Sequence, residues 1–128
     1  MSPVRIAVLV VVFTAPAGST LVGCGGKGCL GNAVQGLRVT VLDGPGGAAV
    51  CGATVTASDG AYSETLAAST PGGSCHYAGA TERMGVYTLA ATFEGRTATT
   101  SNVSVGSDEC HVITQDIQMV LPAASATR

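Results

Sequence analysis

The chain is poor in aromatic residues and in charge. It has no tryptophan, three tyrosines and two phenylalanines in 128 residues, and only 11% of its residues are charged. A hydrophobic core must therefore be built from Val, Leu, Ile and Ala, and a core of such small side chains is thin enough to need covalent cross-links. Six basic and eight acidic residues give a formal net charge of −2 and form no basic patch, which argues against a nucleic-acid partner.

No apolar run in the sequence is long enough for a transmembrane helix. The longest, residues 6–15, is about half of the roughly 20 residues that a hydrocarbon core requires. Arg5 precedes this run, and small and polar residues follow it. That order is typical of a secretory signal peptide, so we expect residues 1–23 to be removed on export.

The signal-like segment ends in Leu21-Val22-Gly23-Cys24, which resembles the lipobox of bacterial lipoproteins. The resemblance implies cleavage before Cys24, a diacylglycerol on its sulfur and a palmitate-type acyl group on the new amine. The membrane is then a partner through the lipid on Cys24, and the exported protein lies on the cell envelope. Gly25 replaces the Asp that favours the inner membrane in that family, which points to the outer membrane. The alternative is an ordinary signal peptide followed by a chance cysteine.

Residues 24–36 are glycine-rich and show no periodic pattern, so we expect a flexible tether between lipid and domain. The only lysine of the chain, Lys27, lies in this segment. A Lys–Asn isopeptide cross-link of the kind found in some surface adhesins is therefore not available to the domain that follows.

No segment shows the 3.6-residue period of an amphipathic helix over a helix length. From residue 37 onward, short alternating segments rich in Val and Thr are separated by Gly, Asp, Pro and Ser. We expect seven strands in residues 37–121, forming an all-β, two-sheet sandwich of transthyretin-like or Ig-like type, and a frayed tail at 122–128. The expected strands cover residues 37–41, 53–57, 61–66, 75–80, 86–93, 97–105 and 112–121.

Strict alternation also predicts which side chains face the core, because successive residues of a strand point to opposite faces. The expected inward residues are Leu37, Val39, Val41, Tyr87, Leu89, Ala91, Phe93, Val103, Val105, Ile113, Ile117, Met119 and Leu121.

Several turn and strand motifs occur in an order that resembles the carboxypeptidase regulatory-like family over residues 37–121. The resemblance implies a transthyretin-like (prealbumin-like) sandwich and a non-catalytic module that supports, spaces or binds. Arg96 departs from the pattern, because the family often has an aromatic residue there. The motifs are Asp43-Gly44-Pro45-Gly46, Gly52-Ala53-Thr54-Val55-Thr56, Asp59-Gly60, Gly85-Val86-Tyr87-Thr88-Leu89 and Glu94-Gly95.

With Cys24 assigned to the lipid, four of the five cysteines remain, an even number that favours disulfides in an oxidising compartment. Following the chain up and down the expected strands brings Cys51 and Cys75 to one end of the sandwich. The same path brings Cys29 and Cys110 to the other end. Because a disulfide needs Cα atoms within roughly 7 Å, we predict the pairs Cys51–Cys75 and Cys29–Cys110.

Both histidines follow a cysteine, as Cys75-His76 and Cys110-His111, and Cys with His is typical of zinc or copper sites. If His76 and His111 converged, the protein would be a small metal-dependent hydrolase or a metal carrier, which is the alternative function. Neighbouring residues of a strand point to opposite faces, however, and cysteines in disulfides are not thiolate ligands. We therefore expect no metal site and no cofactor.

The sequence contains no recognisable catalytic motif. It lacks a Gly-x-Ser-x-Gly elbow and the C-terminal Tyr-Arg-Gly-Ser of the hydroxyisourate hydrolases, which share the expected fold. Asp108, Glu109 and Asp116 supply few of the roughly six to eight oxygens that calcium prefers. The sequence thus predicts no enzyme and no catalytic residue, but a lipid-anchored cell-envelope module with a structural role or a protein or glycan ligand at its loops.

Overall fold

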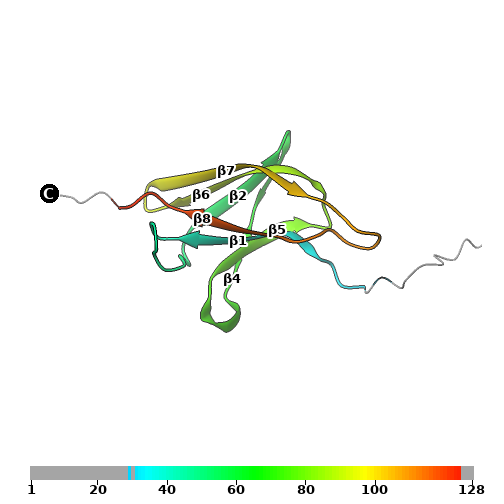
Figure 1. Cartoon of the computed structure of the whole chain (residues 1–128), viewed down its shortest axis with the longest axis horizontal. Helices are drawn as coiled ribbons and strands as arrows, with labels where there is room; N and C mark the ends of the chain where they lie inside the picture. Colours follow the sequence, from blue (N-terminus) through cyan, green and yellow to red (C-terminus); the bar gives the residue numbers. More distant parts are fainter. Residues whose placement is uncertain (1–28, 30, 125–128) are drawn as a thin grey trace, which may run out of the picture.

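Two four-stranded sheets pack face to face in the computed structural model, which describes residues 29 and 31–124 (Figure 1). One sheet has the order β4-β5-β1-β8 and the other the order β3-β2-β6-β7. The prediction of an all-β sandwich is confirmed, but the sandwich has eight strands and not seven. The elements are β1 (Gln35–Leu42), β2 (Thr54–Asp59), β3 (Tyr62–Thr65), β4 (Ala67–Ser69), the short 3-10 turn η1 (Pro71–Gly73), β5 (His76–Thr81), β6 (Gly85–Phe93), β7 (Arg96–Val105) and β8 (Gln115–Val120).

The additional strand arises because the chain changes sheets at Leu66. The expected single strand at 61–66 is β3, which pairs with β2, and it is followed by β4, which pairs with β5 in the opposite sheet. Leu66 lies between them with only 4% of its surface exposed, and its N–H donates to the Val55 carbonyl at 2.8 Å. All three residues of β4 are exposed, so this strand carries no alternating pattern that the sequence could reveal.

Strand directions define two ends of the sandwich. All pairings are antiparallel except that of β1 with β8, which is parallel. One end contains the β2–β3 turn, the β5–β6 turn and residues 106–114, and we call it the Cys29 end. The Cys51 end holds residues 43–53, residues 70–75 and the β6–β7 turn. Figure 1 shows the N-terminal part of the described chain entering at the Cys29 end and residues 121–124 leaving at the other.

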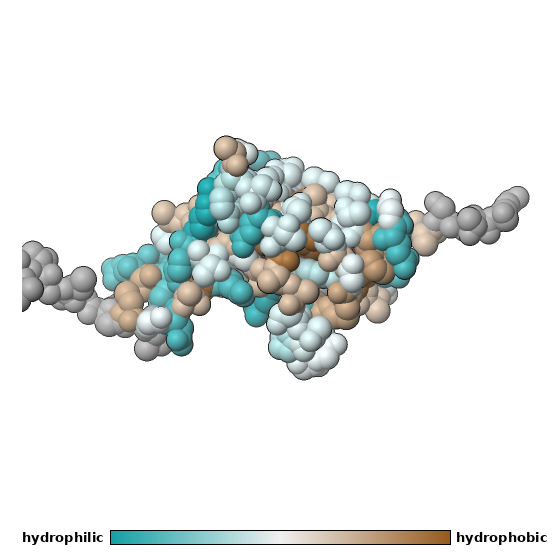
Figure 2. Space-filling model, turned by 180° about the vertical axis from the view of Figure 1, so that it is seen from behind, coloured by the Kyte–Doolittle hydropathy of each residue, from teal (hydrophilic) through white to brown (hydrophobic). Residues whose placement is uncertain are grey.

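The core between the sheets follows the alternation that the sequence predicts. Leu37, Val39 and Val41 of β1 are fully buried, and so are Tyr87, Leu89 and Ala91 of β6, whereas Phe93 is partly buried. Tyr77 and Tyr87 are the largest fully buried side chains, which compensates for the absence of tryptophan. The outer surface seen in Figure 2 is mostly hydrophilic or weakly polar, with hydrophobic residues in patches.

One predicted core residue is wrong. Ile113 is 50% exposed, and its neighbour Val112 is buried instead at 5%. The expected strand at 112–121 does not begin until Gln115, because residues 106–114 form a loop closed by a bridge between Ser107 and Val112. The period of two therefore does not extend through this loop. Met119 and Leu121 are buried as predicted, and Ile117 packs against the core.

The domain also begins earlier than predicted, since β1 starts at Gln35 and not at residue 37. Gly36 lies where a Cβ would come within 2.8 Å of Val105 Cγ1 and 2.9 Å of the Ala80 carbonyl oxygen. This glycine therefore allows close packing, and residues 35–36 belong to the sandwich rather than to a tether. The expected signal peptide at 1–23, the expected lipid attachment at Cys24 and the tether residues 25–28 and 30 lie outside the described residues. No helix in residues 29 and 31–124 is long and apolar enough to cross a membrane.

Candidate functional site

The two disulfides close the two ends of the sandwich, as predicted. Cys51 and Cys75 are bonded with their Cα atoms 5.1 Å apart, and Cys29 and Cys110 with theirs 5.3 Å apart. The strand directions from which this pairing was predicted are also the directions observed in the structure. Two disulfides in so small a domain indicate an oxidising, exported environment.

At the Cys51 end, the disulfide and Tyr77 together hold the loop before β2. The Tyr77 hydroxyl donates to the Val50 carbonyl at 2.7 Å and accepts from the Ala53 N–H at 3.0 Å. Cys75 is 2% exposed, whereas Cys51 is exposed on the surface. Both sides of Cys51 are thus fixed to the core, so this loop has a defined shape without a helix or strand of its own.

Arg96 connects further segments at the same end. Its Nη1 lies 2.6 Å from Asp43 Oδ1 and donates to the Pro122 carbonyl at 3.2 Å, and its Nη2 is 3.6 Å from Glu94 Oε2. The guanidinium also lies 5.8 Å from the centre of the Phe93 ring. Where the family resemblance leads us to expect an aromatic residue, this chain has a cation that is 13% exposed and joins three surface segments.

At the Cys29 end, Glu82 joins the start of β1 to residues 106–114. Its Oε1 accepts from the Val34 N–H at 2.7 Å and lies 2.6 Å from His111 Nδ1, and its Oε2 accepts from the Val112 N–H at 3.4 Å. These donors, the Val34 N–H first and His111 next, lower the pKa of Glu82. The partners Val34 and His111 are 48 and 29 residues away from Glu82, so the residues around Glu82 do not predict these contacts.

The three candidate calcium ligands do not converge. Asp108 accepts from the N–H groups of His111 at 2.9 Å and Cys110 at 2.8 Å, which lower its pKa. Asp116 lies on β8 and forms an ion pair with Arg38 of β1, which lowers the pKa of Asp116. Asp108 therefore stabilises a turn, Asp116 stabilises a strand pair, and Glu109 remains on the exposed loop.

The two histidines lie at opposite ends of β5. His76 is the first residue of β5, with its Nδ1 3.1 Å from Thr40 Oγ1, whereas His111 contacts Glu82, just past the last residue of β5. At about 3.3 Å per residue, the length of β5 separates the two imidazoles by roughly 20 Å. Within residues 29 and 31–124, no group of three or more His, Cys, Asp and Glu residues is placed to hold a metal ion.

Arg83 links two turns at the Cys29 end. Its guanidinium carbon lies 3.8 Å from the centre of the Tyr62 ring, and its Nη1 donates to Asp59 Oδ2 at 3.0 Å and to the Tyr87 hydroxyl at 2.9 Å. The Tyr87 hydroxyl donates in turn to the Arg83 carbonyl at 3.0 Å. Arg83 therefore connects the β2–β3 turn to the β5–β6 turn through partly buried polar contacts with Asp59 and Tyr87.

Two open hollows lie beside the Cys29–Cys110 disulfide, with volumes of about 200 Å³ and 370 Å³. Glu82, Cys110 and His111 line both of them. Ser107 lines the smaller hollow, but its hydroxyl donates a hydrogen bond to Met84 Sδ at 2.9 Å. Glu82 and His111 form a carboxylate–imidazole pair, yet Glu82 is also the acceptor for two backbone N–H groups, so the arrangement is that of a structural junction.

Comparisons of the chain with protein-family models, with curated proteins and with solved structures find no match.

The contacts of Glu82 with Val34, His111 and Val112 make the stability of the domain depend on pH. Because the pKa of Glu82 is lowered below its ordinary 4.5 in the folded state, its contribution is complete above that pH and is lost as the pH falls through the folded value. We expect the urea midpoint of the wild-type domain to decrease below about pH 4.5, and Glu82→Gln to make this dependence shallower. Urea titrations between pH 3 and pH 7 measure it. Glu109→Gln, which removes an exposed carboxylate of the same end, is the matched control. Parallel curves for wild type and Glu82→Gln would contradict the role of the junction.

Proposed function

We propose that this protein is a bacterial lipoprotein, attached to the cell envelope through a lipid on Cys24. The observation that carries the proposal is the use of the cysteines. The two disulfides occupy four of the five, and the fifth is the last residue of Leu21-Val22-Gly23-Cys24. Each acyl chain on that cysteine adds about 0.8 kcal/mol per buried methylene, and two or more chains hold a small domain stably on a bilayer.

The attached domain is proposed to be a non-catalytic module of the carboxypeptidase regulatory-like, transthyretin-like type. An eight-stranded sandwich of two four-stranded sheets is in keeping with that assignment. The polar groups of the Cys29 end support a non-catalytic role, because Glu82, Asp108 and Arg83 all bind backbone or side-chain partners of the domain itself. They hold segments together and are not arranged around a common point.

The loops of the Cys51 end are the proposed surface for a protein or glycan ligand. Cys51–Cys75, Tyr77 and Arg96 hold these loops in one conformation. A loop that is already ordered loses little conformational entropy when it binds, so affinity is gained without new contacts. A module that presents such loops on the outer membrane would serve a structural or binding role at the cell surface or in the periplasm.

The test of the anchor is chemical. The full chain is expressed in a bacterial host with and without globomycin, an inhibitor of lipoprotein signal peptidase, and the N-terminal peptide is analysed by mass spectrometry. We expect a mature chain that begins at Cys24 with a diacylglycerol and an acyl group, and an uncleaved precursor with the inhibitor. Cys24→Ser is expected to lose both the lipid and membrane fractionation. An unmodified Cys24 thiol in the mature wild-type protein would refute the proposal.

The alternative, a metal-dependent hydrolase or metal carrier using His76 and His111, is tested by elemental analysis of the purified protein. Stoichiometric zinc or copper that is lost in His76→Ala and in His111→Ala would favour that alternative over a binding module.

A further inference from the structure

The Cys29–Cys110 disulfide makes the link between Cys24 and the sandwich short. We propose that the Cys29 end is the surface that faces and contacts the lipid bilayer, and that the Cys51 end points away from it. This inference depends on the proposed lipid attachment at Cys24. The surface meets lipid, because only a short length of chain lies between the anchor at Cys24 and the disulfide-bonded Cys29.

The tether can be bounded from the residue count. Cys29 is held by its bond to Cys110, which belongs to residues 106–114 at the Cys29 end. Five residues separate Cys24 from Cys29 in the numbering, and a fully extended chain spans at most about 3.6 Å per residue, or roughly 18 Å in total. The disulfide thus shortens the glycine-rich tether that the sequence suggests, because it fixes the chain well before β1 begins.

The length of the sandwich exceeds this reach. β6 has nine residues and runs from the Cys29 end to the Cys51 end, which corresponds to about 30 Å at 3.3 Å per residue. If the Cys51 end lay on the bilayer, Cys29 would be about 30 Å above it, farther than the roughly 18 Å that the tether can span. The inverted orientation is therefore excluded, and the loops fixed by Cys51–Cys75 remain accessible from outside.

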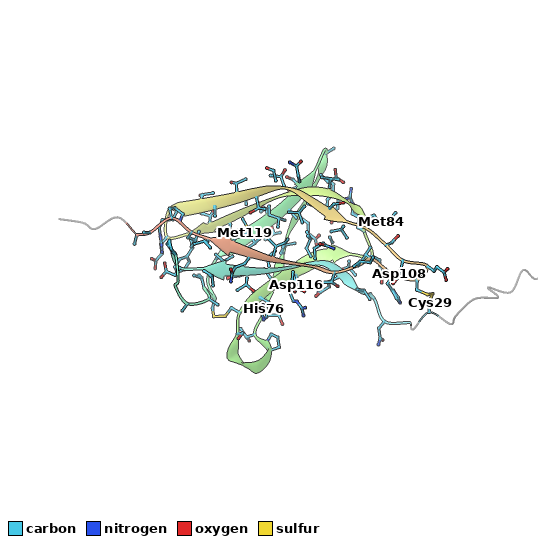
Figure 3. All side chains as sticks on the ribbon, viewed as in Figure 1. Cys29, His76, Met84, Asp108, Asp116 and Met119 are labelled. Atoms are coloured by element: carbon cyan, nitrogen blue, oxygen red, sulfur yellow. A yellow bond between two sulfur atoms is a disulfide. The ribbon has the colours of Figure 1, made fainter. Side chains whose placement is uncertain are left out.

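The surface of the Cys29 end fits contact with the headgroup layer. Among the residues that the structure describes, three of the four exposed large hydrophobic side chains are at or near this end, namely Met84 at 58%, Val86 at 53% and Ile113 at 50%. Figure 3 shows Met84 and Asp108 on the same side of the molecule as Cys29. The carboxylates of Glu82 and Asp108 already accept hydrogen bonds from backbone N–H groups of the domain, so they lose less hydration when they approach the headgroup layer.

Loss of the disulfide should change the orientation. Without it, the first of the described residues with a hydrogen bond to the sandwich is Val34, whose N–H and C=O both bind Glu82. Ten residues would then separate it from Cys24 and would span up to about 36 Å, which is longer than the sandwich. The domain could turn over, and the Cys51 end could reach the bilayer.

The absence of tryptophan from the chain provides a clean probe. Single tryptophans are introduced at the Cys29 end, as Met84→Trp and as Ala61→Trp in the exposed β2–β3 turn, and at the Cys51 end as Glu94→Trp. The lipidated full-length proteins are reconstituted into phosphatidylethanolamine–phosphatidylglycerol vesicles that contain a dansyl-headgroup lipid. Energy transfer from tryptophan to dansyl is then measured, and circular dichroism confirms that each variant is folded.

We expect energy transfer from both Cys29-end tryptophans to be several-fold greater than transfer from Glu94→Trp. Adding Cys29→Ser and Cys110→Ser to Glu94→Trp should raise its transfer toward theirs. Equal transfer from both ends in the disulfide-bonded, lipidated protein would overturn the inference and leave the lipid anchor intact. Absence of lipid in the mass spectrum, with no vesicle binding, would instead refute the proposed function itself.

Discussion

Replacing both cysteines of the Cys51–Cys75 disulfide by alanine is expected to lower the melting temperature of the domain by about 14–28 °C. The bond joins residues 24 positions apart, and the loop-entropy estimate for a loop of that length is about 3.5 kcal/mol. In a domain of this size, each kcal/mol changes the melting temperature by about 4–8 °C. Both loops that the bond joins lie outside the eight strands, and the loop around Cys51 is also held by the Leu42–Ala49 bridge and the Tyr77 hydroxyl.

The matched control is the Cys29→Ala/Cys110→Ala double variant. Its loop is longer, with 81 positions between the cysteines, so loop entropy alone would predict a larger effect, of about 4.5 kcal/mol. We expect a smaller loss, because Cys29 precedes Val34, the first of the described residues with a hydrogen bond to the sandwich, and the released segment regains conformational freedom in the folded state. Differential scanning calorimetry of both variants without reductant measures the difference. A larger loss for the Cys29→Ala/Cys110→Ala variant would show that the N-terminal segment contributes more to folding than its contacts indicate.

Leu89→Ala is expected to destabilise the domain by about 2–5 kcal/mol, which approaches the whole stability of a domain with so thin a core. Leu89 is fully buried at the centre of β6, which pairs with β2 on one side and β7 on the other. Removal of its side chain leaves a cavity between the two sheets. Urea unfolding followed by tyrosine fluorescence or circular dichroism gives the change in unfolding free energy.

Val86→Ala is the control on the same strand. Val86 is 53% exposed and faces outward, so its truncation should change stability by less than about 0.5 kcal/mol. Similar losses for the two variants would mean that the faces of β6 are assigned wrongly.

The sequence predicts those features of the fold that depend on local periodicity. In β1 and β6 the inward residues alternate without interruption, and Leu37, Val39, Tyr87 and Leu89 are buried as the pattern predicts. The disulfides could also be predicted, because the direction of each strand is enough to assign every cysteine to one end of the sandwich. The identity of the neighbouring strands is not needed. An error in the number of strands does not change the result, since β4 continues in the direction of β3.

Features that depend on contacts between distant segments could not be predicted. Glu82 meets Val34 and His111, which are 48 and 29 residues away, and nothing in the residues around Glu82 encodes either partner. The change of sheet at Leu66 and the exposed position of Ile113 arise from strand pairing and loop closure. Both features interrupt the period of two on which a sequence-based assignment depends.

By itself, the sequence determined the all-β class of this protein, the alternation of its main strands and the pairing of its four domain cysteines, because each follows from local pattern and chain direction. Only the tertiary structure decided the order of strands in the two sheets, the separation of His76 from His111 and the junction at Glu82. These depend on which segments become neighbours when the two sheets pack, and that choice is made by the core as a whole. The same packing brings Cys110 to Cys29, so a glycine-rich stretch that the sequence presents as a long flexible tether is fixed to the domain near its beginning.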